Sequence, residues 1–519
     1  MNARRSLAIL ILLLALLVPY APTPGEAQAR SEAPAGQMTW AVHISLAPIW
    51  FDPAEHTGII SVMMVLTAVH DAMVKPMPGK PFAPSLAESW TTSKDGLVYE
   101  FVVRKGVVFH NGDALTAEDV KFSFERYKGA AASLLKEKVA AVEVVDPYRV
   151  RFRLKEPWPD FMTFYGSPAS GAGWIVPKKY VEKVGDEGFK KAPIGAGPYK
   201  FVSFNPGVEL VLEAHAAYWR KTPSVKRLVL RVVPDESTRL AMLKNGEVDI
   251  AYSIRGALAE ELRKSPGLAL KATYLQGTYW VLFADQWDPK SPWADRRVRL
   301  AASHSMNRKG LIDAETLGLA KMSGSIIPQS FDFYWPAPPP PAYDPAQAKK
   351  LLAEAGFPQG FDAGDYTCDT SYSNIAETII NDFRTIGIRT RLRPLERAGF
   401  FKEYAEKKLK NVIQGSSGAY GTAATRIESF VAAGGAYVYG SYPDIEGLVR
   451  EQGSILDRKK REQTLHRIQQ LLHDKIVYAP IWELALLNGQ GPRVAEGGLG
   501  LISNHAYSAP YEDVRLKKQ

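Results

Sequence analysis

Strand and helix patterns alternate along most of this chain of 519 residues. The clearest strand pattern is 148–154, where four apolar residues alternate with three arginines. A period of two predicts a strand with one buried and one solvated face, and 99–103 is its expected partner. Similar runs lie at 208–213, 228–233 and 388–392. Together with the helix patterns between them, they predict an α/β architecture rather than a helix bundle or an all-β sandwich.

Helices are indicated by their capping residues. Thr116 precedes acidic residues at 118 and 119, where the helix dipole favours negative charge. Asp344-Pro345 predicts another helix start, and further helices are expected at 235–244, 373–386 and 458–474. The proline-rich stretch 336–341 favours an extended surface strap instead.

Residues 1–29 are typical of a secretory signal peptide. Arg4 and Arg5 precede an apolar run at 7–18, and Ala27-Gln28-Ala29 has the small-x-small pattern of a cleavage site. The apolar run is shorter than the roughly 20 residues that a membrane-spanning helix needs. We therefore expect cleavage after Ala29 and a periplasmic protein. General secretion fits the flanking residues better than twin-arginine export, and no cysteine near the site predicts a lipid anchor.

Charge and cysteine content exclude several protein classes. The chain has 64 basic and 55 acidic residues, a net charge of +9, and the two signs alternate. The densest basic run, 458–461, fits a solvated helix face better than a nucleic-acid site, so no nucleic-acid partner is expected. The single cysteine, Cys368, excludes an internal disulfide and a four-cysteine zinc site.

No catalytic motif is complete in this sequence. Metalloprotease, nucleophile-elbow, phosphate-loop and dinucleotide fingerprints are all absent. Ser133 and Lys136 match a Ser-x-x-Lys pattern, but no Lys-Thr-Gly accompanies it. His466 and His473 are one heptad apart, which two solvent-facing histidines explain better than a metal pair. We therefore expect no enzyme activity, no cofactor and no metal site.

Aromatic residues occur beside glycines at several places. Trp174 follows two glycines, Tyr279-Trp280 follows Gly277, and Tyr420 lies between Gly418 and Gly421. Flat rings on adaptable backbone can line a ligand cleft. Most aromatic residues are core residues, so the core interpretation is favoured for each of these, and the cleft interpretation stays open.

A longer series of blocks resembles the extracellular solute-binding proteins, family 5, which are the oligopeptide-, dipeptide- and nickel-binding receptors of ABC importers. The first blocks are Ala87-Glu88-Ser89-Trp90, Ser93-Lys94-Asp95-Gly96, Tyr99-Glu100-Phe101, Arg104-Lys105-Gly106-Val107, Phe109-His110-Asn111-Gly112-Asp113 and Thr116-Ala117-Glu118-Asp119-Val120. Later blocks in the same order are Gly195-Ala196-Gly197-Pro198-Tyr199, Asp295-Arg296-Arg297-Val298-Arg299, Tyr343-Asp344-Pro345 and 476–481.

These blocks also have physical interpretations of their own. Asp95-Gly96 predicts a hairpin turn, and Asn111-Gly112 predicts a tight turn before a capped helix. Gly195 and Gly197 predict a bend or a close approach to another segment. Such residues identify a scaffold and leave the ligand open.

The resemblance implies a two-lobed periplasmic binding protein type II fold with an inserted third domain. Lobe I would comprise 38–69, 193–282 and 485–519, the inserted domain 70–192, and lobe II 283–484. The hinge would lie near 280 and 485, and closure on a ligand would precede docking on the permease. The expected partners are a small-molecule or peptide ligand and ABC permease membrane subunits, and a monomer is expected.

Family resemblance also places the ligand-binding segments. The segment after Asp52-Pro53 lines the cleft in the family, which implies ligand contacts from His56, Thr57 and Gly58 here. His56 is equally compatible with a solvated loop. The loop 166–174, ending at Trp174, and the pair Tyr279 and Trp280 near the hinge are the next expected contacts.

One segment departs from the family pattern. Peptide-binding members carry a Trp and an amine-binding Asp where this chain reads Gln414-Gly415-Ser416-Ser417-Gly418-Ala419-Tyr420-Gly421. With Tyr420 and Arg426 here and no acid before Glu428, a carboxylate, phosphate or polyhydroxyl ligand becomes as plausible as a peptide. Arg426 could also be a surface helix residue.

The sequence therefore predicts a non-enzymatic substrate-binding protein of an ABC importer. Its expected ligand is a short peptide or a small polar or anionic organic solute, bound reversibly and delivered to a membrane permease. An exported enzyme or a ligand sensor on the same scaffold is the alternative.

Overall fold

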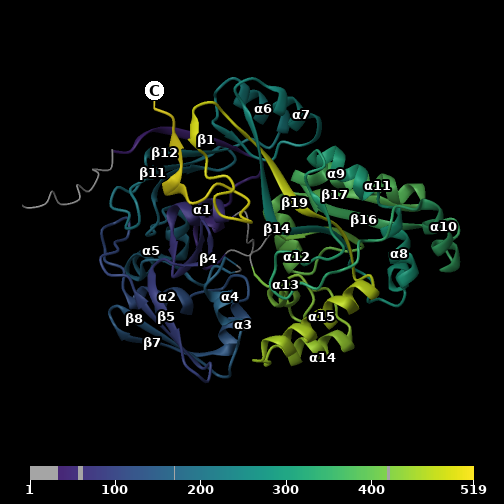
Figure 1. The fold of residues 1–519 in the computed structure, drawn as a ribbon, viewed down its shortest axis with the longest axis horizontal. Coiled ribbons are helices and arrows are strands. Elements are labelled where there is room, and N and C mark those ends of the chain that lie inside the picture. Colours follow the sequence, from purple (N-terminus) through teal and green to yellow (C-terminus); the bar gives the residue numbers. More distant parts are fainter. Residues whose placement is uncertain (1–32, 56–61, 169, 418–420, 519) are drawn as a thin grey trace, which may run out of the picture. The chain divides into compact units, whose positions relative to one another are not determined.

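A mixed sheet of eleven strands forms the backbone of the protein. The computed structural model describes residues 33–55, 62–168, 170–417 and 421–518, and Pro34–Gln519 form one compact unit. The sheet has the strand order β10 (Tyr199–Asn205), β11 (Glu209–Ala214), β12 (Val225–Val232), β1 (Ala35–Val42), β13 (Ile250–Ala251), β19 (Tyr478–Gln490), β14 (Ala269–Phe283), β18 (Val412–Ser417), β16 (Phe361–Asp369) and β17 (Ile388–Leu395), and β15 (Lys321–Met322) pairs with β19 (Figure 1).

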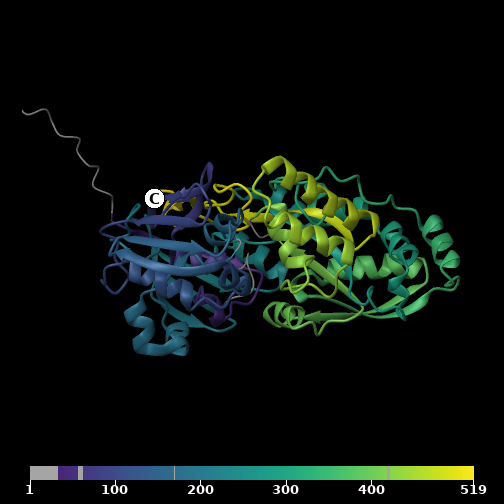
Figure 2. The same cartoon turned by 90° about the horizontal axis from the view of Figure 1, so that it is seen from below.

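Smaller sheets account for the other described strands. An antiparallel sheet, in blue in Figure 2, has the order β5 (Ala87–Thr92), β6 (Val98–Val103), β8 (Arg149–Leu154) and β7 (Val139–Asp146). Three two-stranded sheets pair β2 (Asp71–Ala72) with β9 (Trp174–Ile175), β3 (Val74–Met77) with β4 (Lys80–Pro84), and β20 (Val494–Glu496) with β21 (Arg515–Leu516).

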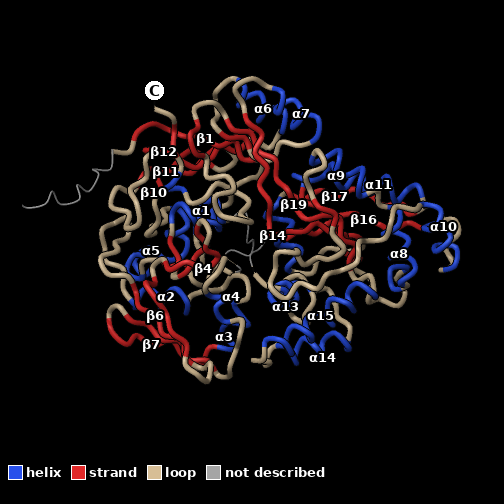
Figure 3. Tube along the Cα trace, viewed as in Figure 1, coloured by secondary structure: helices blue, strands red, loops and turns tan. Residues whose placement is uncertain are grey.

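Helices connect and cover the strands, as the blue segments of Figure 3 show. The α-helices are α1 (Met63–Val69), α2 (Ala117–Glu125), α3 (Ala132–Lys138), α4 (Phe161–Tyr165), α5 (Lys178–Lys191), α6 (Glu236–Lys244), α7 (Gly256–Lys264), α8 (Arg296–Ser305), α9 (Arg308–Thr316), α10 (Pro345–Glu354), α11 (Ser373–Thr385), α12 (Arg397–Ala405), α13 (Ala423–Phe430), α14 (Pro443–Gln452) and α15 (Arg458–Asp474). Short 3-10 helices are η1 (Pro48–Phe51), η2 (Pro292–Ala294), η3 (Thr370–Tyr372) and η4 (Tyr511–Asp513).

Local sequence patterns predicted these elements well. β8 pairs with β6, with Val150 and Phe152 fully buried and Arg149 and Arg153 exposed, which confirms the period-two prediction. The helices at 235–244, 373–386 and 458–474 are confirmed as α6, α11 and α15. At α2 the expected Thr116 cap is part of a capping box with Asp119.

The proline-rich stretch and the glycine pair also behave as predicted. Residues 336–341 belong to no helix or strand. A side chain at Gly195 would place its Cβ 2.1 Å from the Val69 carbonyl oxygen, and one at Gly197 would place it 2.6 Å from the Ala68 carbonyl oxygen. The end of α1 therefore passes directly against this segment, and the close-approach prediction is confirmed.

The apolar core is divided into separate clusters. The largest surrounds the main sheet, a second includes Phe101, Phe152 and Phe161, and a third includes Trp280 and Phe430. The boundaries expected for the lobes and the inserted domain stay a prediction. In the part of the chain described, no helix has the length and apolar character to span a membrane.

We expect Gly195→Ala to lower the free energy of unfolding by about 1–3 kcal/mol, because overpacking a well-packed site forces the backbone to move. Gly447→Ala in α14 is the matched control, since a Cβ there meets nothing within 4 Å. It should leave stability unchanged or raise it by up to about 1 kcal/mol. Urea denaturation of both variants measures this, and equal effects would contradict the packing argument.

Acid should destabilise this fold through its buried histidines. Burial lowers the pKa of His70 from 6.5 to about 4, although its Nε2 is hydrogen-bonded to the Phe51 carbonyl oxygen at 2.9 Å. Between pH 6.5 and 4 the unfolded chain therefore binds more protons than the folded chain, so stability is complete above pH 6.5 and falls as the pH drops.

For each such histidine we expect a loss of about 1.4 kcal/mol per pH unit within this window. Urea titrations from pH 7.5 to 4.5 should show that the slope is shallower in His70→Gln than in the unchanged protein. Identical slopes would show that His70 does not contribute.

Candidate functional site

The candidate site lies where two blocks of parallel strands end. β1 runs parallel to β12 and β13, and β16 runs parallel to β17 and β18. The long antiparallel pair β14 and β19, the β14–β19 ribbon, joins the two blocks (Figure 1). Ligands of α/β sheets bind beyond the carboxyl ends of such strands, at the point where the strand order reverses.

Strand register shows that the two sets of carboxyl ends face each other. β13 and β14 run in the same direction, since both are antiparallel to β19, and Ala251 at the end of β13 lies level with Leu270 of β14. β18 runs the opposite way and ends at Ser417, which pairs with Thr278. Both blocks therefore point toward the stretch of β14 between Leu270 and Thr278.

Polar residues occupy the positions just beyond these strand ends. His43 follows β1, Tyr372 closes the 3-10 turn after β16, and Arg397 begins the helix after β17. His43 Nε2 is hydrogen-bonded to the Tyr372 hydroxyl at 3.3 Å, which joins the two blocks directly. We call His43, Tyr279, Asp369, Tyr372 and Arg397 the tyrosine–arginine cluster.

A buried ion pair anchors this cluster. Arg397 Nη1 lies 2.5 Å from Asp369 Oδ2, and both side chains are less than 10% exposed. Burial alone would lower the pKa of Arg397, but Asp369 and neighbouring tyrosines outweigh burial and raise it above its usual value. Asp369 also accepts a hydrogen bond from the Ser371 amide at 3.0 Å, which fixes the turn that carries Tyr372. The guanidinium therefore stays charged in a fixed position.

Aromatic rings pack on Tyr372 and His43 of the cluster. The Tyr279 ring centre is 5.3 Å from that of Tyr372 and 6.0 Å from that of Trp482, in edge-to-face geometry. The Tyr507 ring lies 6.3 Å from the His43 ring. Burial, followed by the proximity of Tyr372, raises the pKa of Tyr279 well above 10, so its hydroxyl stays protonated at neutral pH.

His43 connects the cluster to an open groove of about 290 Å³. The groove is also lined by Glu236, Arg239, Arg255 and Asn374, among others. Burial lowers the pKa of His43 well below 6.5, and Arg239, Arg397 and Arg255 lower it further, so the ring is neutral at pH 7. Its Nδ1 is buried and has no hydrogen-bond partner within the described ranges. This nitrogen therefore has an unused hydrogen-bonding capacity next to the groove.

The two arginines of the groove have different partners. Arg239 donates to four backbone carbonyl oxygens, among them Tyr252 O at 2.8 Å, and burial lowers its pKa to about 10. Arg255 donates to Glu236 at 3.1 Å and, from Nη1, to Asn374 Oδ1 at 3.1 Å. Arg255 thus links the start of α6, which carries Glu236, to α11, which carries Asn374.

Of the residues predicted from the sequence to contact ligand, the structure places Tyr279 in the cluster. Trp280, the next residue of β14, points to the opposite face and packs on Phe430 and Tyr478 with ring centres 5.1 and 5.9 Å away. Trp174 is buried in the core around the main sheet and its strand pairs with Ala72. Their contact with a ligand stays a prediction.

Arg426 is buried rather than placed on the helix surface. Its Nη1 donates to the carbonyl oxygens of Ile326 at 3.1 Å and Ser417 at 3.3 Å, and burial lowers its pKa to about 9. These contacts give Arg426 a structural role, and a ligand contact stays a prediction. His56, Thr57, Gly58 and Tyr420 lie outside the described residues.

Sequence reasoning missed His43, Tyr372 and the Asp369–Arg397 pair. Each comes within three residues of a strand end, so polar residues directly after apolar strand patterns were the available signal. In the described parts of the chain, no group of three or more His, Cys, Asp or Glu residues is arranged to hold a metal ion.

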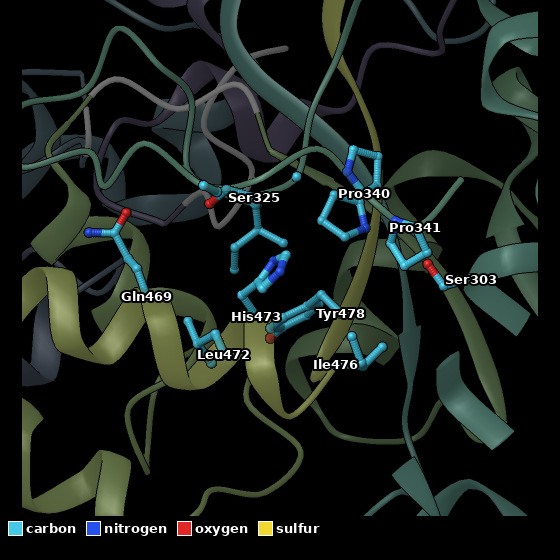
Figure 4. Close-up of a pocket in the computed structure, with 13 residues that line it drawn as sticks. Ser303, Ser325, Pro340, Pro341, Gln469, Leu472, His473, Ile476 and Tyr478 are labelled. Atoms are coloured by element: carbon cyan, nitrogen blue, oxygen red, sulfur yellow. The ribbon is translucent and has the colours of Figure 1, made fainter. Parts of the chain in front are cut away.

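A second cavity is too small for an organic solute. It lies under the proline-rich strap between Pro340, Pro341, His473 and Tyr478, and its volume is about 30 Å³ (Figure 4). A single water molecule needs about 10–15 Å³ on this measure, so the cavity has room for only a few waters. The larger groove beside His43 is therefore the stronger site.

Comparison with known proteins agrees with this geometry. Residues 81–437 match the model of the bacterial extracellular solute-binding proteins, family 5 Middle. Heme-binding protein A of Haemophilus influenzae is 27% identical over 486 residues, which cover 86% of this chain and 87% of that protein. Glutathione-binding protein GsiB of Salmonella choleraesuis is 31% identical over 320 residues, 60% of each chain.

A solved structure has the same fold. The periplasmic binding protein DppA of Helicobacter pylori, in complex with the peptide STSA, superposes with a TM-score of 0.80 and 24% identity, covering 93% of this chain and 98% of that one. The predicted α/β, two-lobed periplasmic binding protein fold is therefore confirmed. By its sequence match and its fold, the chain belongs to the bacterial extracellular solute-binding proteins of family 5.

Proposed function

We propose that this protein is the periplasmic substrate-binding protein of an ABC importer, and that it binds a small carboxylate-bearing solute or a short peptide at the tyrosine–arginine cluster. The bound solute would then be delivered to the membrane permease. The observation that carries the ligand class is the buried, fixed Arg397 beside the neutral His43, at the facing ends of both strand blocks.

The chemistry of the cluster favours a polar ligand with an anionic group. A guanidinium is planar and presents donors that match a carboxylate, whereas a neutral imidazole nitrogen and tyrosine hydroxyls match amide or hydroxyl groups. Tyrosine rings add apolar contact area around these polar groups. A polar and aromatic mixture of this kind is typical of sites for small organic molecules.

The size of the groove favours a small ligand. Its volume of about 290 Å³ is near the lower end of the range of roughly 300–1,000 Å³ for small-molecule sites. The relatives are named for heme, glutathione and peptide binding, so family membership alone leaves the ligand open. The volume of the groove therefore fits a solute near the size of a dipeptide better than a long peptide.

Catalysis finds no support at this site. His43 is hydrogen-bonded to Tyr372, and among the described residues of the cluster no serine or cysteine lies within hydrogen-bond reach of it. Cys368 is buried, and burial raises the pKa of its thiol to about 11, which disfavours the thiolate nucleophile. The relatives are binding proteins.

A thermal-shift screen tests the proposed function. Dipeptides, glutathione, opine-type conjugates, sugars and nickel complexes form the panel. A true ligand at 100 times its dissociation constant should stabilise the protein by about 2.7 kcal/mol. We expect acidic dipeptide-sized solutes to stabilise it and sugars to leave it unchanged; stabilisation only by uncharged sugars would contradict the ligand class.

Two substitutions test the cluster itself. Tyr372→Phe keeps the ring but removes the hydroxyl, and it should weaken binding of the best acidic solute by about 1 kcal/mol. Arg397→Lys keeps the charge but loses the planar fork, and it should weaken binding by about 1.5–3 kcal/mol. Titration calorimetry measures both affinities.

Arg393→Lys is the matched control, because Arg393 lies on β17 and pairs with Glu403 outside the cluster at 2.9 Å. Its affinity should equal that of the unchanged protein. Circular dichroism confirms that each variant is folded. Unchanged affinity in both Tyr372→Phe and Arg397→Lys would show that the solute binds elsewhere.

A further inference from the structure

One buried ion pair crosses between two parts of the protein that have separate cores. Asp160 precedes α4, whose aromatic residues belong to the cluster around Phe101 and Phe152. Arg461 lies on α15, which packs in the cluster around Trp280 and Phe430. Arg461 Nη2 contacts Asp160 Oδ2, and each side chain is only 5% exposed.

Little else joins α4 to α15. The apolar residues of the two helices belong to distinct clusters rather than one core, and the backbones of α4 and α15 approach each other only sparsely. Among the described residues, Asp160–Arg461 is the ion pair that joins 70–192 to 283–484. A contact that buries charge without a shared apolar core is easier to separate than a packed interface.

Arg461 is held in place by its own side, whereas the Asp160 carboxylate points to its partner. Gln452 of α14 accepts from Arg461 Nη2 at 2.9 Å and from Nε at 3.2 Å, and the guanidinium lies 5.4 Å from the Phe333 ring centre. Asp160 is the residue before α4, yet its carboxylate makes no capping hydrogen bond to that helix. The carboxylate is therefore directed at Arg461 rather than used to cap its own helix.

We propose that Asp160 and Arg461 form a latch between the two sides: the closed arrangement is accessible while both partners are present and becomes unfavourable when either one is lost. The energetics fit a reversible latch. Desolvating two charges costs about as much as their attraction returns, so an intact buried pair contributes little net stability, whereas removing one partner leaves an uncompensated buried charge. Loss of either partner should therefore open the closed arrangement without unfolding either core.

The latch is tested in the ligand-free protein, so the result does not depend on which solute binds. Spin labels at Lys136→Cys on α3 and Gln463→Cys on α15, both at exposed positions, report the separation, in a Cys368→Ser background. Pulsed electron–electron double resonance should resolve a short distance for the closed form and a longer distance for the separated form. Asp160→Asn and Arg461→Gln should each raise the ratio of separated to closed populations by about tenfold or more.

Arg458→Gln is the matched control. Arg458 is one turn before Arg461 and pairs with Asp332, but both of these residues lie on the same side and are exposed. Its distance distribution should match that of the unchanged protein. The double variant Asp160→Asn with Arg461→Gln should open no further than either single variant, because the two act as one unit.

The latch would be overturned if Asp160→Asn and Arg461→Gln gave the same distance distribution as the unchanged protein. If Arg461→Gln fails to fold, Asp160→Asn, which has nearly the same shape, decides the question. If no solute stabilises the protein but the distances shift, only the proposed ligand class is contradicted. If a solute stabilises the protein but the distances do not shift, only the latch is contradicted.

Discussion

The β14–β19 ribbon is the constraint on which the rest of the structure depends. β19 pairs with β13 of the first block, β14 pairs with β18 of the second block, and the two long strands pair with each other. Because neighbours on the two ends run in opposite directions, the carboxyl ends of both blocks face the middle of β14. A slip of one residue would exchange Tyr279 and Trp280 between the faces of the sheet and remove Tyr279 from the cluster.

Several buried arginines stabilise the fold of the protein by donating hydrogen bonds to backbone carbonyl oxygens. Arg239, Arg299 and Arg308 donate mainly to backbone carbonyl oxygens, for example from Arg308 Nε to Pro480 O at 2.7 Å. Burial lowers the pKa of Arg308 to about 9 and that of Arg239 to about 10, yet both remain charged at neutral pH. Part of the net charge of +9 is thus inside the protein, which is why the total charge says little about the ligand.

Local structure could be predicted from the sequence, whereas the site could not. β8 and α15 depend on periodicity and caps within a few residues, and both lie where the patterns predict. His43 and Tyr372 are 329 residues apart, and only the strand order brings them within 3.3 Å. Trp280 and Arg426 have residue types that suit a ligand site, but neighbouring Phe430 packs against both and makes them part of a core.

Separate cores with a polar junction suit a protein that has to open again. A solute can shift the equilibrium between open and closed forms only by its difference in affinity for the two. An apolar interface would favour closure at roughly 25 cal/mol for each Å² buried, and a few hundred Å² would already exceed what a small solute contributes. An ion pair such as Asp160–Arg461 is close to balance between desolvation and attraction. Closure therefore stays sensitive to the bound solute, and the observed affinity depends on the fraction of protein that can close.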